Sequence, residues 1–353
     1  ENMTFEKAWN YDDYLPTRKG TYYLTTDIVL SSPATIDRED VTICLNGHKI
    51  TSSATGEAID VQGSTLTITD CNKNPGSISA PNGNGINAVS GSINNNSVSA
   101  KVYLYNVTIK DCGGDAIHGD TSTNGSEFYL YNASILNNKG TGVYTSRGST
   151  GQDVTIINSE ISGNSESGVT ITDSSHLTMI NSKVENNKSY GIYIDSSSSI
   201  PSTITDSAIS GNDAVGLCIQ SNPTVIGGNT VISGNYSSSN PGGVYIRGAS
   251  VTIKDNVEIT GNTSGRDTYQ NGNTGGGVYL NLRNSSSKLT LAGNVKITGN
   301  KDGDDNESNL GADCYESKNY LMTVESGFKG NVGIHVTGAL IPTASKPTNI
   351  ARG

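Results

Sequence analysis

The chain is poor in aromatic and apolar residues. Of its 353 residues, one is Trp and three are Phe, and apolar residues make up 33%. This composition suits a thin stacked core of Val, Ile and Leu, with most of the 17 Tyr outside it. No apolar run approaches the about 20 residues of a membrane-spanning helix, which argues against membrane insertion. Residues 1–20 hold no apolar signal segment, so we expect a mature or excised fragment.

Basic residues are also few. Lys and Arg number 23 against 33 Asp and Glu, so the formal net charge is −10 and the isoelectric point is near 4.9. Nucleic acids and anionic membranes need clustered Lys and Arg, which argues against both as partners. An acidic surface rich in Gly, Ser, Thr, Asn and Tyr fits an extracellular protein, secreted or attached to a cell wall. We expect it to be a monomer.

What the chain has in abundance is a repeat, clearest over residues 154–172, VTIINSEISGNSESGVTIT. An apolar residue recurs every 23 to 38 residues or so, roughly one coil, and in seven of eight cases an Asn follows three residues later. The apolar positions are Ile109, Ile135, Ile161, Val184, Ile209, Ile232, Ile259 and Ile297. The positions three residues later are Cys112, Asn138, Asn164, Asn187, Asn212, Asn235, Asn262 and Asn300.

This repeat predicts an all-β fold, a parallel β-solenoid in which each repeat is one coil of short strands. Helical arrays are excluded because no window has apolar residues at i, i+3, i+4 and i+7, and sandwiches because two-residue hairpin turns are missing. An inward Asn at one corner of every coil would bond to the next coil's backbone, so we expect an internal Asn ladder. The predicted parts are a cap at 1–20, a solenoid of about eleven coils at 21–340 and a linker at 341–353.

Alternation along the strands predicts two inward columns that form the core. One column consists of Ile117, Val143, Val169, Ile192, Leu217, Val244 and Val278, and the other of Leu104, Leu130, Ile156, Met179, Ile204 and Ile253. The same register puts Cys44 and Cys314 inward, Cys71 and Cys112 at corners, and Cys218 on an outer strand face. Since no two of the five cysteines share adjacent places, we expect free thiols rather than disulfides.

The outer face of the strand after each glycine carries two further columns. The first consists of His118, Tyr144, Thr170, Tyr193, Cys218, Tyr245, Tyr279 and Tyr315, and the second of Asp120, Ser146, Thr172, Asp195, Gln220, Arg247, Asn281 and Ser317. Tyr rings offer flat faces to sugar C–H groups, while the polar side chains can bond to sugar hydroxyls. The predicted glycan-binding residues are Tyr144, Tyr193, Tyr245, Tyr279 and Tyr315 with Gln220, Arg247 and Asn281. The alternative is that Tyr is simply a suitable exposed strand residue.

Glycoside hydrolysis needs two carboxylates about 5 Å apart or about 6.5–9.5 Å apart. Asp120 and Asp195 are three coils apart and fail this test, whereas Asp173 and Asp195 in successive coils are the best candidate pair. With 33 acidic residues, a chance pair is the alternative. His118 and Asp120 are a second candidate acid/base unit, or else solvated neighbours on an exposed strand.

Two long connections, residues 263–276 and 301–310, precede the same strand in consecutive coils. We expect them to lie side by side as the rim of a groove. Within the second, Asp302, Asp304, Asp305 and Glu307 are spaced to bind Ca²⁺, the one cofactor that the sequence suggests. The run lacks the Gly at position six and the Glu at position twelve of an EF-hand loop, and a solvated acidic loop is the alternative.

With its Asn column, the chain resembles the right-handed parallel β-helices of the pectate-lyase-like superfamily over nearly all of residues 21–340. The segments YYLTTDIVL, CLNGHKI and LTITDC resemble β-helical regions of surface proteins from Gram-positive gut bacteria. GGGVYL at 275–280 and VKITGN at 295–300 resemble repeats of autotransporter-like and cell-wall proteins, which implies adhesion. Cys218 beside Gln220 resembles the Cys–Gln thioester of some Gram-positive adhesins, with a plain exposed thiol as the alternative.

Two functions follow from these observations. The first is an extracellular adhesion module that binds glycans or a host surface glycoprotein through the Tyr and polar columns. The second is a secreted glycoside hydrolase, or else a polysaccharide lyase, acting at the same face. The β-helical lacto-N-biosidases of gut bacteria resemble this chain in the general character of their sequence, but their aspartate pair does not map onto this chain. The Ca²⁺-binding carboxylates of pectate lyases and the Asp-Asp motif of polygalacturonases are absent as well.

Overall fold

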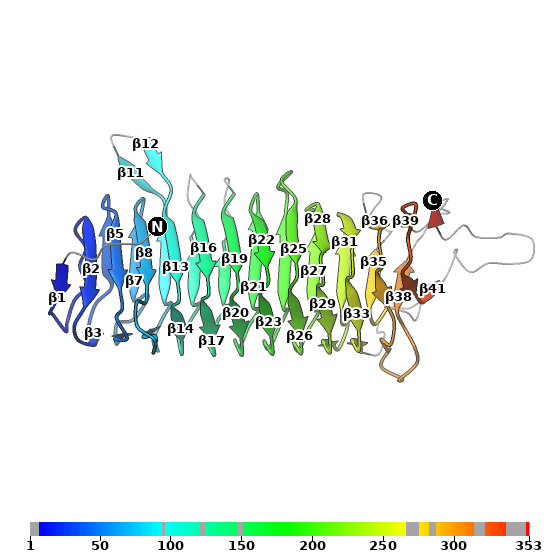
Figure 1. Cartoon of the computed structure of the whole chain (residues 1–353), viewed down its shortest axis with the longest axis horizontal. Coiled ribbons are helices and arrows are strands. Elements are labelled where there is room, and N and C mark those ends of the chain that lie inside the picture. The colour runs from blue at the N-terminus through cyan, green and yellow to red at the C-terminus, as the bar shows by residue number, and fades with distance from the viewer. Residues whose placement is uncertain are drawn as a thin grey trace, which may run out of the picture. The chain divides into compact units, whose positions relative to one another are not determined.

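A computed structural model describes residues 7–93, 96–120, 125–146, 151–265, 275–281, 287–313, 322–336 and 351–352. Within these ranges, every regular element is a β-strand. The chain divides into two compact units, Glu1–Leu177 and Thr178–Gly353, and the boundary falls within β22 (His176–Ile180). Each unit is built from the same three kinds of strand, which follow one another around each coil (Figure 1).

In the first unit, strands of successive coils pair in parallel to form three sheets. The first sheet contains β1 (Lys7–Trp9), β2 (Gly20–Leu24), β5 (Val41–Cys44), β8 (Thr65–Thr69), β13 (Lys101–Tyr105), β16 (Glu127–Tyr131) and β19 (Asp153–Ile157). The second contains β3 (Ile28–Leu30), β6 (Lys49–Ser52), β9 (Ser77–Ser79), β14 (Thr108–Lys110), β17 (Ser134–Leu136) and β20 (Glu160–Ser162). The third contains β4 (Ala34–Asp37), β7 (Ile59–Gln62), β10 (Ile86–Val89), β15 (Ile117–Gly119), β18 (Val143–Thr145) and β21 (Val169–Asp173). An antiparallel hairpin of β11 (Gly91–Ile93) and β12 (Asn96–Val98) stands out from the stacked strands (Figure 1).

The second unit repeats this plan with parallel strands. Its first sheet contains β25 (Ser202–Thr205), β28 (Thr224–Gly227), β32 (Ser250–Ile253), β36 (Lys288–Leu291), β39 (Met322–Val324) and β42 (Ala351–Arg352). Its second contains β23 (Lys183–Glu185), β26 (Ala208–Ser210), β29 (Val231–Ser233), β33 (Glu258–Thr260), β37 (Lys296–Ile297) and β40 (Asn331–Val332). Its third contains β24 (Ile192–Ser196), β27 (Leu217–Gln220), β31 (Val244–Arg247), β35 (Val278–Asn281), β38 (Leu310–Asp313) and β41 (Ile334–Val336). A short pair, β30 (Tyr236–Ser237) and β34 (Thr263–Ser264), lies outside these sheets.

The core consists of apolar side chains stacked from coil to coil. In the first unit, Ile109 pairs with Ile135 and Ile135 with Ile161, and all three are fully buried. In the second unit, Ile209 pairs with Ile232 in the same way. Each buried Ile contributes about 1.5–3 kcal/mol relative to an exposed one. The two predicted inward columns, which begin at Ile117 and Leu104, are also paired from coil to coil and buried within each unit, so they are confirmed. The column that begins at Leu104 also contains Ile226, which the sequence pattern did not indicate.

The Asn ladder is present in both units. In the first unit, Asn164 Oδ1 accepts hydrogen bonds from the backbone N and the Nδ2 of Asn138, at 3.1 and 2.9 Å. Asn138 Oδ1 in turn accepts the Cys112 amide at 3.0 Å. In the second unit the same two hydrogen bonds link each Asn to the next along the series Asn187, Asn212, Asn235, Asn262, Asn300 and Asn309. The predicted ladder is confirmed, and it extends one step further than expected, to Asn309.

The expectation that all cysteines are free is wrong for two of them. Cys44 and Cys71 form a disulfide, with their Cα atoms 6.2 Å apart. The strand register pairs Cys44 with Thr69, so the strands alone leave Cys71 two residues away. The chain turns sharply after β8, because Asp70 accepts the amides of Asn72 and Gly76, and this turn carries Cys71 back over Cys44. Cys112 and Cys218 are free and buried, and Cys314 lies outside the described residues.

The two ends of the predicted solenoid differ in detail from the expectation. Residues 7–9, expected in a strand-free lead-in, form β1, which pairs with β2. The Trp9 ring contacts the rings of Tyr11, Tyr14 and Tyr22 at centroid distances of 4.9, 5.3 and 5.5 Å. Of the predicted linker only residues 351–352 are described, and they pair with β39 as strand β42. The division into cap, solenoid and linker stays a prediction.

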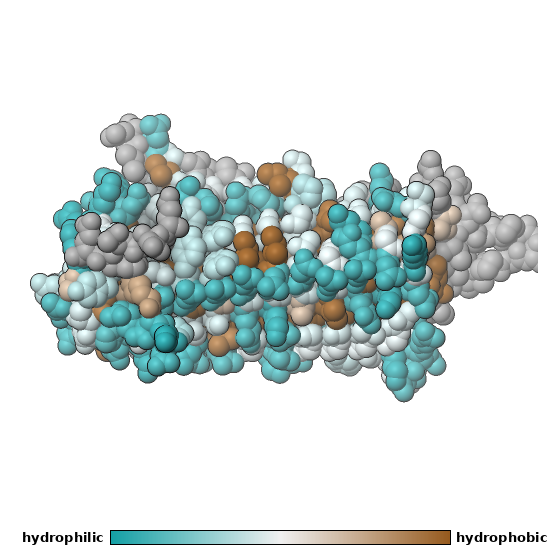
Figure 2. All heavy atoms as spheres, in the orientation of Figure 1, coloured by the Kyte–Doolittle hydropathy of each residue, from teal (hydrophilic) through white to brown (hydrophobic). Residues whose placement is uncertain are grey.

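The surface is mainly polar. On the face drawn in Figure 2, hydrophilic side chains dominate, and apolar ones form separate small patches. In the part of the chain that the structure describes, no helix is long and apolar enough to cross a membrane.

Candidate functional site

The outer face of the third sheet in the second unit carries the expected column of tyrosines. The strand register pairs Tyr193 with Cys218, Cys218 with Tyr245, and Tyr245 with Tyr279. The predicted second column lies two residues further along the same strands and consists of Asp195, Gln220, Arg247 and Asn281. We call these eight residues the tyrosine face. The three Tyr side chains are half-buried, and Arg247 is exposed.

Side chains of the second column hold the tyrosine hydroxyls. Gln220 Nε2 donates to Tyr193 Oη at 2.9 Å, and Tyr193 Oη donates to Asp195 Oδ2 at 3.4 Å. Asn281 Nδ2 donates to Tyr245 Oη at 3.2 Å. In each case the amide belongs to the coil that follows the tyrosine. The ring centroids of Tyr245 and Tyr279 are 5.6 Å apart, so the aromatic surface continues from coil to coil.

Burial sets the protonation of this face. It raises the pKa of Tyr193 to about 12, with the negative charge of Asp195 as the next cause, so the phenol stays neutral at physiological pH. Burial also raises the pKa of the Cys218 thiol to about 12. The expectation of an exposed thiol is wrong, because Cys218 is buried and only 1% exposed. A thiol that is buried and protonated is unreactive.

The expected end of the tyrosine column is also wrong. β38 pairs with β35 so that Gly311 lies opposite Tyr279, where Tyr315 was expected. Asp313 lies opposite Asn281, where Ser317 was expected. The long connection before β38 shifts the register by four residues, which counting from the corner could not reveal. Tyr315 itself lies outside the described residues.

In the first unit, the third sheet carries a different group. His118 stacks on Tyr144, with ring centroids 5.0 Å apart and an interplanar angle of 25°. The His118 Nδ1 lies 2.7 Å from Asp115 Oδ2, and Asp115 Oδ1 accepts the Thr141 amide at 2.6 Å. Asp120 was the expected partner of His118, but the carboxylate within hydrogen-bonding distance of the imidazole Nδ1 is that of Asp115. The i, i+3 spacing of Asp115 and His118 across a corner was the signal available.

Other polar residues of this sheet were also missed. Asp60 Oδ1 accepts from Asn87 Nδ2 at 3.0 Å, and Asp60 Oδ2 accepts from Gln62 Nε2 at 2.5 Å. Asn87 pairs with both Asp60 and His118 in the strand register. A carboxylate, an amide and an imidazole therefore follow one another on the outer face of adjacent coils.

The proposed pair of catalytic carboxylates is divided between the two units. Asp173 ends β21 in the first unit, where its φ of 55° marks the corner, and Asp195 lies in β24 of the second. Catalysis by this pair stays a prediction.

In the first unit Thr172, which was expected on the outer face, is buried and donates its hydroxyl to Thr145 O at 2.6 Å.

The two long connections lie side by side where they begin. Thr263 and Lys301 form a parallel bridge, and the Ser264 amide donates to Lys301 O at 3.0 Å. At the far end, the Gly276 amide donates to Ser308 Oγ at 3.1 Å. Residues 266–274 lie outside the described residues, so the rim itself stays a prediction.

Three of the four carboxylates of the expected Ca²⁺ site have separate partners. Asp302 Oδ1 accepts the amides of Asp304 and Asn306, at 3.0 and 2.9 Å. Asp305 pairs with Lys301 Nζ at 2.6 Å. Glu307 Oε1 accepts from Asn309 Nδ2 at 2.7 Å, next to the end of the Asn ladder. Among the described residues, no three His, Cys, Asp or Glu side chains are grouped closely enough to hold a metal ion.

Comparison with known proteins supports the fold. A family model described as a right-handed beta helix region matches residues 31–201, 92–263 and 167–339. The crystal structure of the periplasmic alginate epimerase AlgG is similar, with 11% identity, a TM-score of 0.57, and coverage of 90% of this chain and 75% of that one. A mutant of the same epimerase gives 12% identity and a TM-score of 0.58 over 90% and 75% of the two chains. At such low identity the likeness is one of fold alone. The search of curated protein sequences found no match.

Proposed function

The chain belongs to the right-handed β-helix family, and on that scaffold we propose that the tyrosine face binds carbohydrate, as part of an extracellular adhesion module. One observation carries the proposal: the amides of Gln220 and Asn281 each hold the hydroxyl of the tyrosine in the preceding coil, Tyr193 and Tyr245 respectively. The rings are thus fixed before any ligand arrives. Fixed rings lose little conformational entropy on binding, which favours affinity.

The chemistry of this face matches that of a sugar. A pyranose ring presents C–H groups that pack on an aromatic ring, and hydroxyls that bond to polar side chains beside it. Arg247 is exposed and supplies donors at the edge of the face. The ligand is a glycan chain or the glycan of a host surface glycoprotein, lying along successive coils.

Three further observations support a carbohydrate partner outside the cell. The net charge of −10 disfavours nucleic acid and anionic lipid. The Cys44–Cys71 disulfide is typical of proteins outside the cytosol. One structural neighbour is a periplasmic epimerase of alginate, which is a polysaccharide.

A glycan array tests the proposal. We expect the protein to bind one class of glycan, and Tyr193→Ala and Tyr245→Ala to weaken that binding about tenfold each, from the lost stacking and burial. The matched control is Tyr236→Ala, which removes an exposed Tyr (51%) on β30, a strand outside the sheet that carries this face. Melting temperatures of all variants exclude unfolding as the cause. Absence of binding to every glycan and to host surface extracts would exclude the adhesion module.

An enzyme acting on glycans, a glycoside hydrolase or a polysaccharide lyase, is the second candidate. The His118–Asp115 pair beside Tyr144 favours it, because an imidazole oriented by a carboxylate can act as a general base and a nearby phenol as an acid. Mucin glycans, milk oligosaccharides and pectins would be incubated with the protein, and products detected by mass spectrometry. Product that disappears in His118→Gln supports this pair. Product that persists in Asp173→Asn and Asp195→Asn removes those two as catalytic residues.

A further inference from the structure

A second group of tyrosines lies in the first unit, on the outer face of the first sheet. Tyr103 pairs with Tyr129, and Tyr105 with Tyr131, on the adjacent strands β13 and β16. The ring centroids are 6.2 Å apart for Tyr103 and Tyr129, 5.7 Å for Tyr105 and Tyr129, and 6.4 Å for Tyr105 and Tyr131. The four rings thus form one chain of ring contacts over two strands. We call them the tyrosine platform.

The platform has ordered neighbours on both sides. On β8, Thr67 and Thr69 pair with Tyr103 and Tyr105, and on β19 Thr155 pairs with Tyr129. At one edge, Tyr103 Oη donates to Glu127 Oε1 at 2.9 Å, and Lys101 pairs with Glu127 at 3.1 Å. Tyr131, at the other edge, is 37% exposed. The platform therefore has hydroxyl-bearing neighbours and one edge held in place by an ion pair.

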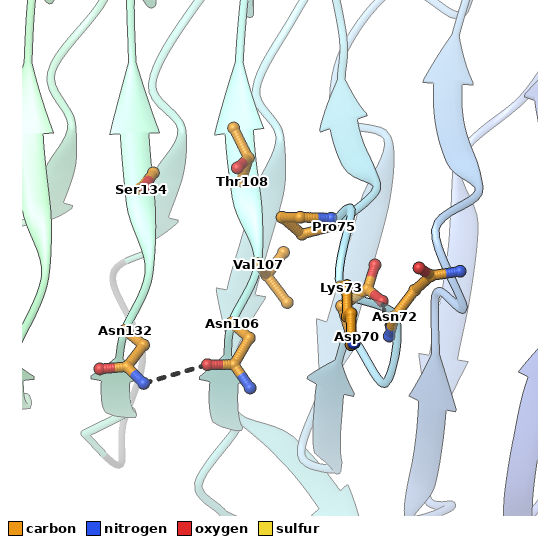
Figure 3. Close-up of a pocket in the computed structure, with 9 residues that line it drawn as sticks. All are labelled: Asp70, Asn72, Lys73, Pro75, Asn106, Val107, Thr108, Asn132 and Ser134. Carbon is orange, nitrogen blue, oxygen red and sulfur yellow. Dashed lines mark hydrogen bonds between the residues drawn. The ribbon is translucent and has the colours of Figure 1, made fainter.

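A surface hollow begins where the platform strands end. Asn106 and Asn132 follow Tyr105 and Tyr131 directly, and both have left-handed backbone, with φ of 57° and 52°. Asn132 Nδ2 donates to Asn106 Oδ1 at 3.1 Å, so the two amides form a continuous strip along the hollow (Figure 3). The hollow has a volume of about 310 Å³. Its lining consists of Asp70, Asn72, Lys73, Pro75, Asn106, Val107, Thr108, Asn132 and Ser134 (Figure 3).

The opposite wall of the hollow is a fixed loop. Asp70 is 4% exposed, and its carboxylate accepts hydrogen bonds from the backbone amides of Gly47, Asn72 and Gly76 at 2.6 to 3.2 Å. The carboxylate therefore stabilises the loop itself. The Cys44–Cys71 disulfide ties the same loop to the preceding coil. The wall therefore presents Asn72, Lys73 and Pro75 from a backbone that is held at both ends. A preformed hollow lined by amides, hydroxyls and one ammonium group offers donors to a ligand rich in oxygen.

We propose that the platform and the hollow together form a second binding site, which takes a chain of pyranose sugars. The rings lie on the tyrosines, and an oxygen-bearing substituent at one end of the chain enters the hollow toward Asn106 and Lys73. Adjacent strands are about 4.8 Å apart, close to the advance of one sugar ring along an extended chain, so successive rings meet successive strands. This site is separate from the tyrosine face and does not rest on it.

Binding of soluble polysaccharides, measured by affinity electrophoresis and calorimetry, tests the site. Tyr129→Ala and Tyr131→Ala are expected to weaken binding about 3- to 10-fold each, whereas Tyr129→Phe keeps the ring and the affinity. Lys73→Met tests the hollow, because it removes the ammonium group at an exposed position. Neutral and carboxylate-bearing polysaccharides are compared. A loss in Lys73→Met confined to the carboxylate-bearing chain identifies the substituent as an acid, and an equal loss for both identifies a hydroxyl or amide.

Two controls separate this site from the tyrosine face. Tyr236→Ala lies on neither surface and is expected to bind like the unaltered protein. Tyr245→Ala changes only the tyrosine face, so a ligand that it loses and Tyr129→Ala keeps belongs to that face. Unaltered affinity in both Tyr129→Ala and Tyr131→Ala, for every polysaccharide that the protein binds, would overturn the second site and leave the first untouched. A protein that binds no polysaccharide at all would overturn both.

Discussion

Gln220 Nε2 donates to Tyr193 Oη at 2.9 Å, so an amide of one coil fixes an aromatic ring of the coil before it. Asn281 does the same for Tyr245 at 3.2 Å. Ring position on the tyrosine face is therefore determined by pairs of neighbouring coils. In each pair, one amide and one tyrosine ring therefore act together.

Removal of the amide loosens the ring without removing it. Gln220→Ala is expected to weaken glycan binding about threefold, less than Tyr193→Ala, because the aromatic surface remains and only its fixed position is lost. Titration calorimetry of both variants with the bound glycan measures the difference. A Gln220→Ala protein as weak as Tyr193→Ala would mean that the amide itself touches the ligand.

Alkaline pH is expected to destabilise the protein. Burial raises the pKa of Tyr103 and Tyr193 to about 12, above the ordinary value of 10.0. A group whose pKa is higher in the folded state adds stability that is complete below its unfolded pKa and is lost as the pH rises to the folded pKa. The melting temperature should therefore fall between pH 10 and 12, and fall less in Tyr193→Phe. An equal fall in that variant would exclude Tyr193 as a contributor.

The interior of the Asn ladder should not accept a charge. Asn212 is 1% exposed, and its Nδ2 donates to Asn235 Oδ1 at 2.8 Å and to Val184 O at 3.2 Å. Asn212→Asp replaces that donor by an acceptor between two oxygens, and should cost several times the about 1 kcal/mol of a neutral hydrogen bond. Chemical denaturation measures this loss. The matched control is the exposed Asn256→Asp, for which we expect little change.

Loss of the disulfide should destabilise the first unit. Cys44 and Cys71 are 27 residues apart, and a disulfide that closes a loop of this size is worth about 3 kcal/mol. The double variant Cys44→Ala, Cys71→Ala should melt at a lower temperature than the oxidised protein and be insensitive to reductant. An oxidised protein whose melting does not change on reduction would contradict the disulfide's contribution.

Calcium should have no effect on melting. Asp305 is paired with Lys301, and Asp302 accepts backbone amides of its own loop, so these carboxylates are already neutralised or bonded. Melting curves with Ca²⁺ and with a chelator should coincide. A rise in melting temperature with Ca²⁺ would mean that the ion binds the folded state and displaces Lys301.

Much of the fold could be read from the sequence, because each coil repeats the same local requirements. The inward column at Ile109, Ile135 and Ile161 and the Asn three residues after most of its members follow from strand alternation and from one corner shape. The tyrosine column from Tyr193 to Tyr279 could also be predicted, since each member lies two residues after the glycine that precedes its strand. These features depend on neighbours within a few residues, and the same local pattern returns in each coil.

Features that depend on the path of a connection could be decided only by the tertiary structure. The turn at Asp70 brings Cys71 to Cys44, and the connection before β38 puts Gly311 where Tyr315 was expected. The contact of His118 with Asp115 depends on how the chain rounds its corner. The tyrosine platform was missed because it lies on another sheet, where contacts between coils group Tyr103, Tyr105, Tyr129 and Tyr131. Corners and loops vary in length from coil to coil, so their side chains meet at places that a regular repeat does not specify.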